Sequence, residues 1–126
     1  MPYKPAGWSS VSPYLIVEGA AATIEFLQQV FGATLLRSFA GDDGTVRHSE
    51  VRIEDSVLMV ADGQEGWPAR PAHVHVYVRD VDAAFARALA AGATSVQAPA
   101  KKDDADRRSG VTDPGGTTWW IATKVE

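Results

Sequence analysis

Residues 17–34, VEGAAATIEFLQQVFGAT, and residues 78–94, VRDVDAAFARALAAGAT, repeat one pattern within this chain of 126 residues. Each stretch reads as the end of a strand, an Ala-rich helix and the tripeptide Gly-Ala-Thr, which stands at 32–34 and again at 92–94. The leading valine recurs after 61 residues and the first glycine of the tripeptide after 60. A period of about half the chain predicts two copies of one supersecondary unit, with a pocket between the halves as the place of function.

The composition limits the class of protein. A length of 126 residues favours one domain, and 45% hydrophobic with 22% charged residues is ordinary globular composition. The net charge of −4 gives no reason to expect a nucleic acid or a membrane as partner. The chain shows no apolar run of the roughly 18 residues that cross a bilayer, and no signal-peptide core. The absence of cysteine excludes disulfides, thiolate metal sites and cysteine nucleophiles but leaves the redox compartment open. A cytoplasmic protein is the default expectation.

Hydrophobic periodicity and turn residues predict the order βαβββ in each copy. The first copy has expected strands at 11–17, 34–39, 46–53 and 56–61 and a helix at 20–31. The second has expected strands at 74–78, 95–98, 109–112 and 117–123, a helix from Val81 to Gly92 capped by Asp80, and a charged loop at 101–108. We therefore expect one α+β domain over 1–126, with module one at about 11–61, a linker at 62–71 and module two at about 72–125.

Strand alternation separates two faces of the predicted sheet. The residues expected to meet the helices are Val51, Ile53, Leu58, Val60, Val74, Val76 and Trp119. A two-residue turn after Ile53 would pair Glu50 with Met59 and Arg52 with Val57. The opposite face then carries the candidate ligand-binding residues Tyr14, His48, Glu50, Arg52, Met59, His73, His75, Tyr77 and Trp120. Ligand sites are concave and mostly apolar with a few polar groups, so this face predicts a binding cup. A solvated or interfacial sheet face is the alternative.

Three segments carry a family resemblance: SPYLIVEGAAATIEFLQQVFGA at 12–33, HSEVRIEDSVLMVAD at 48–62 and DPGGTTWWIAT at 113–123. Together with the paired βαβββ units, they resemble the vicinal oxygen chelate superfamily, and within it the short glyoxalase/bleomycin-resistance/dioxygenase-like proteins. The resemblance implies a cupped eight-stranded mixed sheet with the helices on its outer face. It also implies a homodimer, in some members with exchanged halves. It is specific for fold and says little about function.

Metal-using members of that superfamily, such as glyoxalase I, take ligands from positions that align here with Ser12, Met59, His73 and Trp120. Only His73 among these suits the metals concerned. We therefore expect no cofactor and no tightly bound divalent metal. A displaced metal site built from His48, Glu50, His73 and His75 is the alternative. Against it stands the interpretation that His48 and Glu50 form a hydrogen-bonded pair with Arg52 that orders the wall of the cup.

Two functions of different class remain open. The first is metal-independent capture of an aromatic or cationic small molecule, with Tyr14, Tyr77 and Trp120 for stacking and Glu50 as counter-charge. The second is a lyase, isomerase or dioxygenase with the catalytic candidates His48, Glu50 and His73, acting through a displaced metal or an acid–base pair. The expected partners are a small molecule and a second copy of the chain. The sequence does not identify the ligand.

Overall fold

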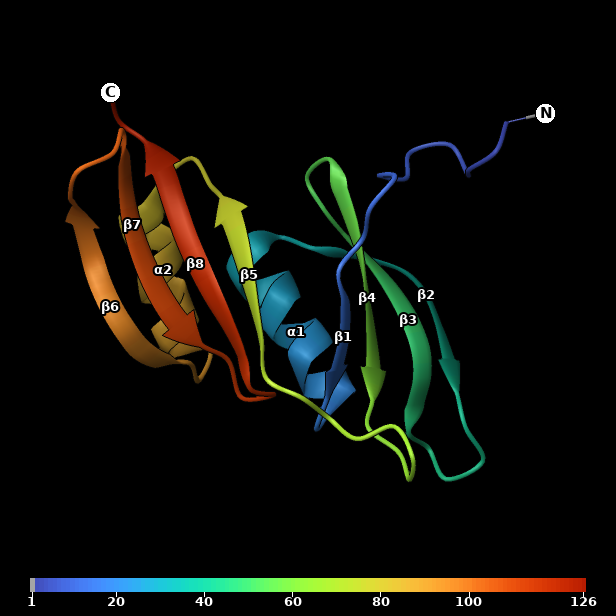
Figure 1. Ribbon diagram of the computed structural model, residues 1–126. Helices are drawn as coiled ribbons and strands as arrows, with labels where there is room; N and C mark the ends of the chain where they lie inside the picture. Colours follow the sequence, from blue (N-terminus) through green and yellow to red (C-terminus); the bar gives the residue numbers. More distant parts are fainter. Residues whose placement is uncertain (1) are drawn as a thin grey trace.

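Two units of like construction lie side by side in the computed structural model, which describes residues 2–126 (Figure 1). The first unit contains β1 (Tyr14–Val17), α1 (Ala20–Phe31), β2 (Thr34–Ala40), β3 (Val46–Ile53) and β4 (Ser56–Asp62). The second contains β5 (Ala72–Tyr77), α2 (Val81–Ala90), β6 (Thr94–Lys101), β7 (Asp106–Thr112) and β8 (Thr117–Lys124). The predicted βαβββ order is confirmed in both modules.

The eight strands form two four-stranded sheets, in the orders β1-β4-β3-β2 and β5-β8-β7-β6. In each sheet the first pairing is parallel and the other two are antiparallel, so both sheets are mixed. Tyr14 pairs with Met59, and His75 pairs with Trp120, each residue of the second pair lying 61 positions after its counterpart. The sequence repeat is therefore a repeat of strand register. Within one chain the expected eight-stranded sheet is divided in two, because β1 and β5 are both edge strands.

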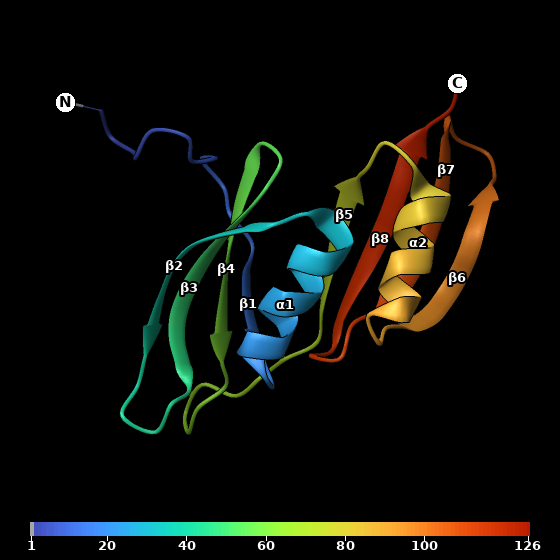
Figure 2. The ribbon, with the colours of Figure 1, turned by 180° about the vertical axis from the view of Figure 1, so that it is seen from behind.

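Both helices cover the same side of the molecule, as the view from behind shows (Figure 2). Helix α1 buries Ile24, Leu27 and Val30, the three-residue spacing that places apolar side chains on one helical face. It ends at Gly32, whose φ of 64° is the left-handed conformation that glycine adopts readily. Helix α2 begins after Asp80, whose carboxylate accepts a hydrogen bond from the Ala83 backbone N–H at 3.1 Å. These caps agree with the sequence predictions.

The core lies between the helices and the covered faces of the sheets. The predicted hairpin register is confirmed, and its apolar residues are buried together with Trp119: Val51, Ile53, Leu58 and Val60. Val74 and Val76 are only half-buried, so the prediction that both are fully buried was wrong. The reason is that β5 is an edge strand whose apolar side borders the gap between the sheets.

Several strand ends differ from the sequence prediction. Strand β1 begins at Tyr14 rather than at residue 11, after a proline that has no N–H for a ladder. Strand β7 begins at Asp106, within the segment expected to be a loop. Its charged residues are paired there, because Arg107 contacts Asp82 at 2.9 Å and Arg108 contacts Asp106 at 2.8 Å.

Neither helix has the length and apolar character needed to cross a membrane, within residues 2–126.

Candidate functional site

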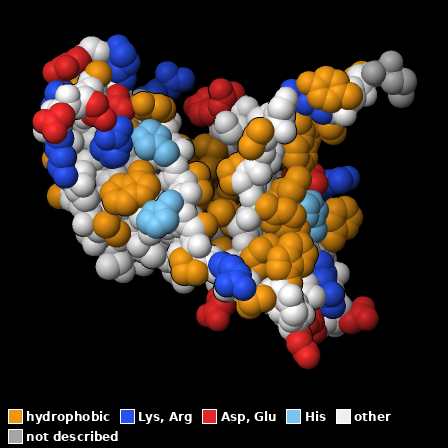
Figure 3. All heavy atoms as spheres, viewed as in Figure 1, with side chains coloured by type: hydrophobic (Ala, Val, Ile, Leu, Met, Phe, Trp, Pro, Cys, Tyr) orange, Lys and Arg blue, Asp and Glu red, His pale blue; other side chains and the backbone are white. Residues whose placement is uncertain are grey.

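The candidate residues gather on the uncovered faces of the two sheets. Figure 3 shows this side of the molecule, with two imidazoles beside hydrophobic side chains on the second unit and one imidazole on the first. The candidates divide into two groups, because the two sheets are separate. The module-one cluster consists of the candidates Tyr14, His48, Glu50 and Met59 with their neighbours Arg37 and Phe39. The module-two cluster consists of the candidates His73, His75, Tyr77 and Trp120 with their neighbours Asp106 and Arg108.

Hydrogen bonds connect the module-one cluster into a chain. The Tyr14 hydroxyl lies 3.1 Å from His48 Nδ1, and His48 Nε2 lies 2.8 Å from Glu50 Oε2. Arg37 Nε donates to Glu50 Oε1 at 2.8 Å. Burial raises the pKa of Glu50, but the hydrogen bonds from His48 and Arg37 outweigh it and hold that pKa below its ordinary value. An ionised carboxylate can only accept, so Nε2 of His48 is the donor and Nδ1 faces the Tyr14 hydroxyl.

The guanidinium partner of Glu50 differs from the expected one. His48 and Glu50 are paired as expected, but Arg37 of β2 takes the place that the sequence suggested for Arg52. Arg52 instead donates to the backbone oxygen of Gly7 at 2.7 Å and so holds the N-terminal arm. Sequence reasoning missed Arg37, although its register opposite Glu50 would have indicated it once β2 and β3 were aligned.

In the module-two cluster, Trp120 and His73 form one pair. The indole Nε1 of Trp120 donates to His73 Nδ1 at 3.1 Å, and the two ring planes differ by 8°. The indole rests against Gly110 of β7, where an added Cβ would lie 2.6 Å from Cζ3 of Trp120. The predicted face for Trp120 is confirmed, since Trp119 points into the core and Trp120 points away from it.

A second group in the same cluster contains two residues outside the candidate ligand-binding set, Asp106 and Arg108. Tyr77 donates its hydroxyl proton to Asp106 Oδ2 at 2.7 Å, which raises the pKa of Tyr77. Arg108 Nε donates to His75 Nε2 at 3.2 Å. Burial, followed by the Arg108 charge, holds the pKa of His75 below its ordinary value. Neither stood among the candidates, because their segment was expected to be a loop.

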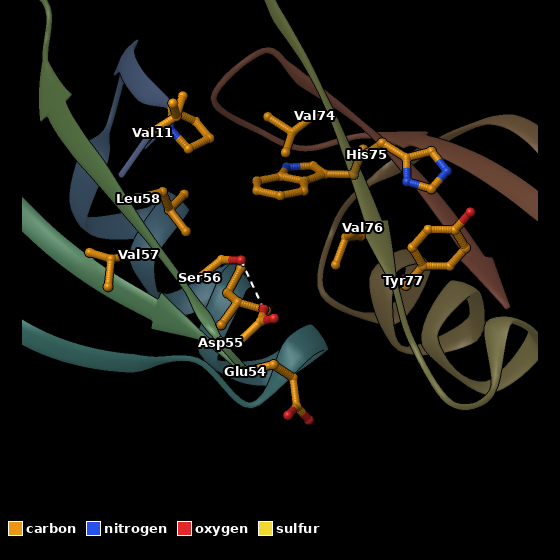
Figure 4. A pocket seen from close by; sticks show the side chains of 13 residues that line it. Val11, Glu54, Asp55, Ser56, Val57, Leu58, Val74, His75, Val76 and Tyr77 are labelled. Carbon is orange, nitrogen blue, oxygen red and sulfur yellow. Dashed lines mark hydrogen bonds between the residues drawn. The ribbon is translucent and has the colours of Figure 1, made fainter. Parts of the chain in front are cut away.

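A slot of about 360 Å³ opens between the two sheets. It is lined by residues of the β3–β4 hairpin, the segment before β1, strand β5 and Trp119. Figure 4 shows Val74 and Val76 pointing into the slot, whereas His75 and Tyr77, the only candidates that border it, point away. The slot is thus an apolar gap beside the core. The module-one cluster does not line it, and the module-two cluster borders it only through His75 and Tyr77, which point away.

The residues at the family's metal positions do not suit a set of metal ligands. Trp120 has no atom that can ligate a metal, and its N–H engages Nδ1 of His73. The hydroxyl oxygen of Ser12 lies 3.4 Å from that of Ser9. Met59 offers a soft thioether, which does not suit the harder divalent ions. Within residues 2–126 no three His, Cys, Asp or Glu side chains are grouped as a metal would need. His48 and Glu50 lie on β3, in a different sheet from His73 and His75 on β5.

Comparison with known proteins identifies the scaffold. Residues 10–121 match the family model of the Glyoxalase/Bleomycin resistance protein/Dioxygenase superfamily. An uncharacterized protein of Mycobacterium bovis is 36% identical over 127 residues, covering 92% of this chain and 84% of that protein. An uncharacterized protein of Mycobacterium tuberculosis is also 36% identical, covering 92% of this chain and 75% of that protein.

Solved structures agree in fold. TioX from Micromonospora sp. ML1 is 27% identical with a TM-score of 0.72, covering 91% of this chain and 99% of TioX. TnmS3, an antibiotic binding protein from Streptomyces sp. CB03234, is 21% identical with a TM-score of 0.70, covering 98% of both chains. These matches span both modules, so the whole βαβββ pair is the shared unit.

Proposed function

This chain belongs to the Glyoxalase/Bleomycin resistance protein/Dioxygenase superfamily, and we propose that within it the protein is a metal-independent binder of an aromatic or cationic small molecule. The ligand would lie against the uncovered sheet faces, where the two clusters combine aromatic rings with a few charged groups. TnmS3, which shares the fold, is described as an antibiotic binding protein. The scaffold can therefore support capture of a small molecule.

One observation carries this proposal: an indole occupies a position where the metal-using members have a ligand. Trp120 cannot coordinate a metal, and its hydrogen bond engages one nitrogen of the single suitable ligand at these positions, His73. An aromatic ring half-exposed on a sheet face offers stacking and cation–π attraction instead. On the other module the buried carboxylate of Glu50 is paired with Arg37 and with His48.

A second copy of the chain would complete the cup. Within one chain the two clusters lie on separate sheets, and several of their aromatic side chains remain open to solvent, with Phe39 50% and Tyr77 60% exposed. A twofold dimer that opposes the module-one cluster of one copy and the module-two cluster of the other would make two equivalent cups. Sedimentation velocity at micromolar concentration should give a dimer; a monomer would contradict this arrangement.

Metal independence and ligand capture can be tested together. We expect proflavine, a planar cationic dye, to bind the dialysed protein saturably in isothermal titration calorimetry, with equal affinity before and after treatment with EDTA. Mass spectrometric metal analysis of the same sample should find less than stoichiometric zinc, nickel, manganese and iron. Stoichiometric metal that survives dialysis, or binding that appears only after metal is added, would refute the proposal.

The module-one cluster favours a second candidate, an enzyme that uses acid–base chemistry. In its hydrogen-bond chain the buried carboxylate of Glu50 contacts the imidazole of His48, and the other imidazole nitrogen contacts the hydroxyl of Tyr14. In such a chain the imidazole accepts the hydroxyl proton and the carboxylate stabilises the imidazolium. Tyr14, which is 41% exposed, would be the group that exchanges a proton with a ligand.

Solvent exchange of carbon-bound protons separates this candidate from simple binding. The probes are α-keto acids (2-oxo acids) and α-hydroxyketones, incubated with the protein in D₂O. If the cluster transfers protons, the NMR signals of the carbon-bound protons next to the carbonyl would disappear. His48→Gln should abolish that exchange, because it removes the proton acceptor. Exchange at the uncatalysed rate with every probe would leave binding as the function.

A further inference from the structure

We propose that Trp120 and His73 form one flat platform on the uncovered face of the second sheet, and that this platform binds planar molecules of three fused aromatic rings with an oxygen acceptor at one edge. The inference rests on the proposed binding function and specifies the class of its ligand. It depends on the geometry of three neighbouring strands, β5, β8 and β7.

The two rings lie side by side in nearly one plane. An indole N–H and an imidazole lone pair both point outward within their ring planes. The hydrogen bond between Trp120 Nε1 and His73 Nδ1 therefore joins the rings edge to edge, with 3.1 Å between the nitrogens. The 8° angle between the planes and the 6.2 Å between the centroids fit this arrangement. The pair thus presents one continuous flat surface rather than two separate rings.

Gly110 explains why the indole lies flat. It stands opposite Trp120 in the β7–β8 ladder, and an added Cβ would lie 2.6 Å from Cζ3 and 2.8 Å from Cε3 of the indole. Any other residue would therefore lift the six-membered ring from the strand. One indole face is covered by the β7 backbone, and the half-exposed side chain keeps its other face available.

The extent of the platform sets the size of the ligand. The imidazole centroid lies 6.2 Å from the indole centroid, so a bicyclic ligand stacked on the indole needs at least a third fused ring to extend toward the imidazole. Offset stacking over this whole area requires a rigid planar molecule, since a flexible one would lose conformational freedom on binding. A single ring or two fused rings would cover the indole alone.

The tautomer of His73 sets the polar feature of the ligand. Because an indole nitrogen only donates, Nδ1 of His73 must be the acceptor, and a neutral His73 then carries its proton on Nε2. That N–H lies at the outer edge of the platform, on an exposed side chain. It can donate to an oxygen acceptor on a substituent that reaches beyond the stacked rings into the plane of the platform.

A graded series of ring systems tests the platform by calorimetry. The probes are the N-acetic acids of 4-pyridone, 4-quinolone and acridone, which share a carbonyl and a carboxylate and carry one, two and three rings. We expect affinity to rise with each ring, with acridone at least tenfold tighter than quinolone. Trp120→Ala should weaken acridone binding at least tenfold, and Gly110→Ala should weaken it by tilting the indole.

His73 provides the sharpest comparison. His73→Ala should weaken acridone binding several-fold and leave quinolone binding unchanged, because two rings need only the indole. His73→Phe restores ring area but cannot accept the indole proton, so it should not restore acridone affinity. Leu89→Ala, at a 40% exposed position on α2, is the control and should bind all three probes like the parent.

Each adverse outcome bears on the platform alone. Equal affinity for two and three rings, or equal loss of both in His73→Ala, would show that the rings do not act as one surface. Acridone binding that persists in Trp120→Ala would place the ligand elsewhere. Failure of the whole series to bind would refute the platform, while proflavine binding in EDTA would still support the proposed function. Should Gly110→Ala unfold, the His73 variants decide the question.

Discussion

The uncovered faces of the two modules share one framework and differ in the side chains at equivalent positions. Strand register makes Met59 the counterpart of Trp120, and Glu50 the counterpart of Gly110. In module one the narrow side chain of Met59 leaves room for the carboxylate of Glu50, which is buried and hydrogen-bonded to its neighbours. In module two the missing side chain leaves room for a flat indole. Module one therefore carries a charged network where it has Glu50 and Met59. Module two carries an aromatic surface, because Gly110 and Trp120 stand at the equivalent positions.

The covered faces differ far less. Val51 pairs with Leu58 in module one, and Val111 pairs with Trp119 in module two, and all four side chains are buried and apolar. The hydrophobic effect acts on the area removed from water and tolerates different apolar shapes. The repeat therefore persists where the helices pack, while the opposite faces can acquire separate chemistry.

The largest expected effect contrasts the two adjacent tryptophans. Trp119 is 1% exposed, packs against Phe31 and donates from Nε1 to Asp113 Oδ2 at 2.8 Å. Trp119→Ala should lower the free energy of unfolding by about 3–5 kcal/mol, the usual cost of truncating a large aromatic core residue. Trp120→Ala should cost clearly less, because one face of its indole is open. Urea unfolding of the two variants gives the comparison.

Leu58→Ala extends the test to module one. As the counterpart of Trp119 it is 4% exposed, and its loss should cost about 2–5 kcal/mol. A Trp120 variant as unstable as the Trp119 variant would mean that both indoles carry core packing. The distinction between covered and uncovered faces would then fail for module two.

The contrast between faces was accessible from sequence because side-chain alternation in a strand is local. The repeat located the strands. The alternation of side chains along a strand then placed Trp119 on the covered face and Trp120 on the uncovered face, as the structure confirms. The two-residue hairpin turn likewise fixed the pairing of Glu50 with Met59. Side-chain alternation alone overestimated the burial of Val74 and Val76, because it does not distinguish an edge strand from a central one.

The charge partners were not accessible in the same way. Arg37 reaches Glu50 across a ladder with two register shifts, which no local pattern predicts. Asp106 and Arg108 lie in a charged segment that resembles a solvated loop, and they become ordered by pairing with each other and with Tyr77 and His75. The partners of these charged side chains thus depend on interactions between strands. The sequence pattern indicates mainly which residues are buried.

The second expected effect concerns the buried carboxylates of the two faces. Glu50→Gln removes the charge that faces both Arg37 and His48, and should lower the free energy of unfolding by about 1–3 kcal/mol. Asp106→Asn in module two should cost less, because Arg108 keeps Asp104 as a second carboxylate partner at 3.0 Å. Urea unfolding at neutral pH measures both. Equal losses would show that the module-one network is no more tightly coupled than the ion pairs of module two.

A smaller effect distinguishes the helix starts of the two modules. Helix α2 is capped by its own Asp80, whereas the first N–H of α1, that of Ala20, donates to Asp62 at the end of β4 at 2.8 Å. Asp80→Ala should cost about 1 kcal/mol, the usual value of a lost N-cap. Asp62→Ala should cost more, because the same carboxylate also accepts from the Val46 N–H. Thermal unfolding ranks the two; the reverse order would indicate that α1 needs no cap from the strand.

The smallest effect is a pH dependence that His75 of module two should confer near neutrality. Burial and then the Arg108 charge hold the pKa of His75 below its ordinary value of 6.5, against the opposing charges of Asp106 and Asp104. The unfolded chain therefore takes up a proton at a higher pH than the folded protein does, and the free energy of unfolding falls as the pH drops below about 6.5. Glu50 also has a lowered pKa, but its stabilisation is lost only below its ordinary value of 4.5. Urea unfolding at about pH 7 and about pH 5.5 separates the two windows, since the unperturbed imidazole titrates between them. His75→Gln should reduce the loss of stability between these pH values, and an unchanged loss would assign it to other groups.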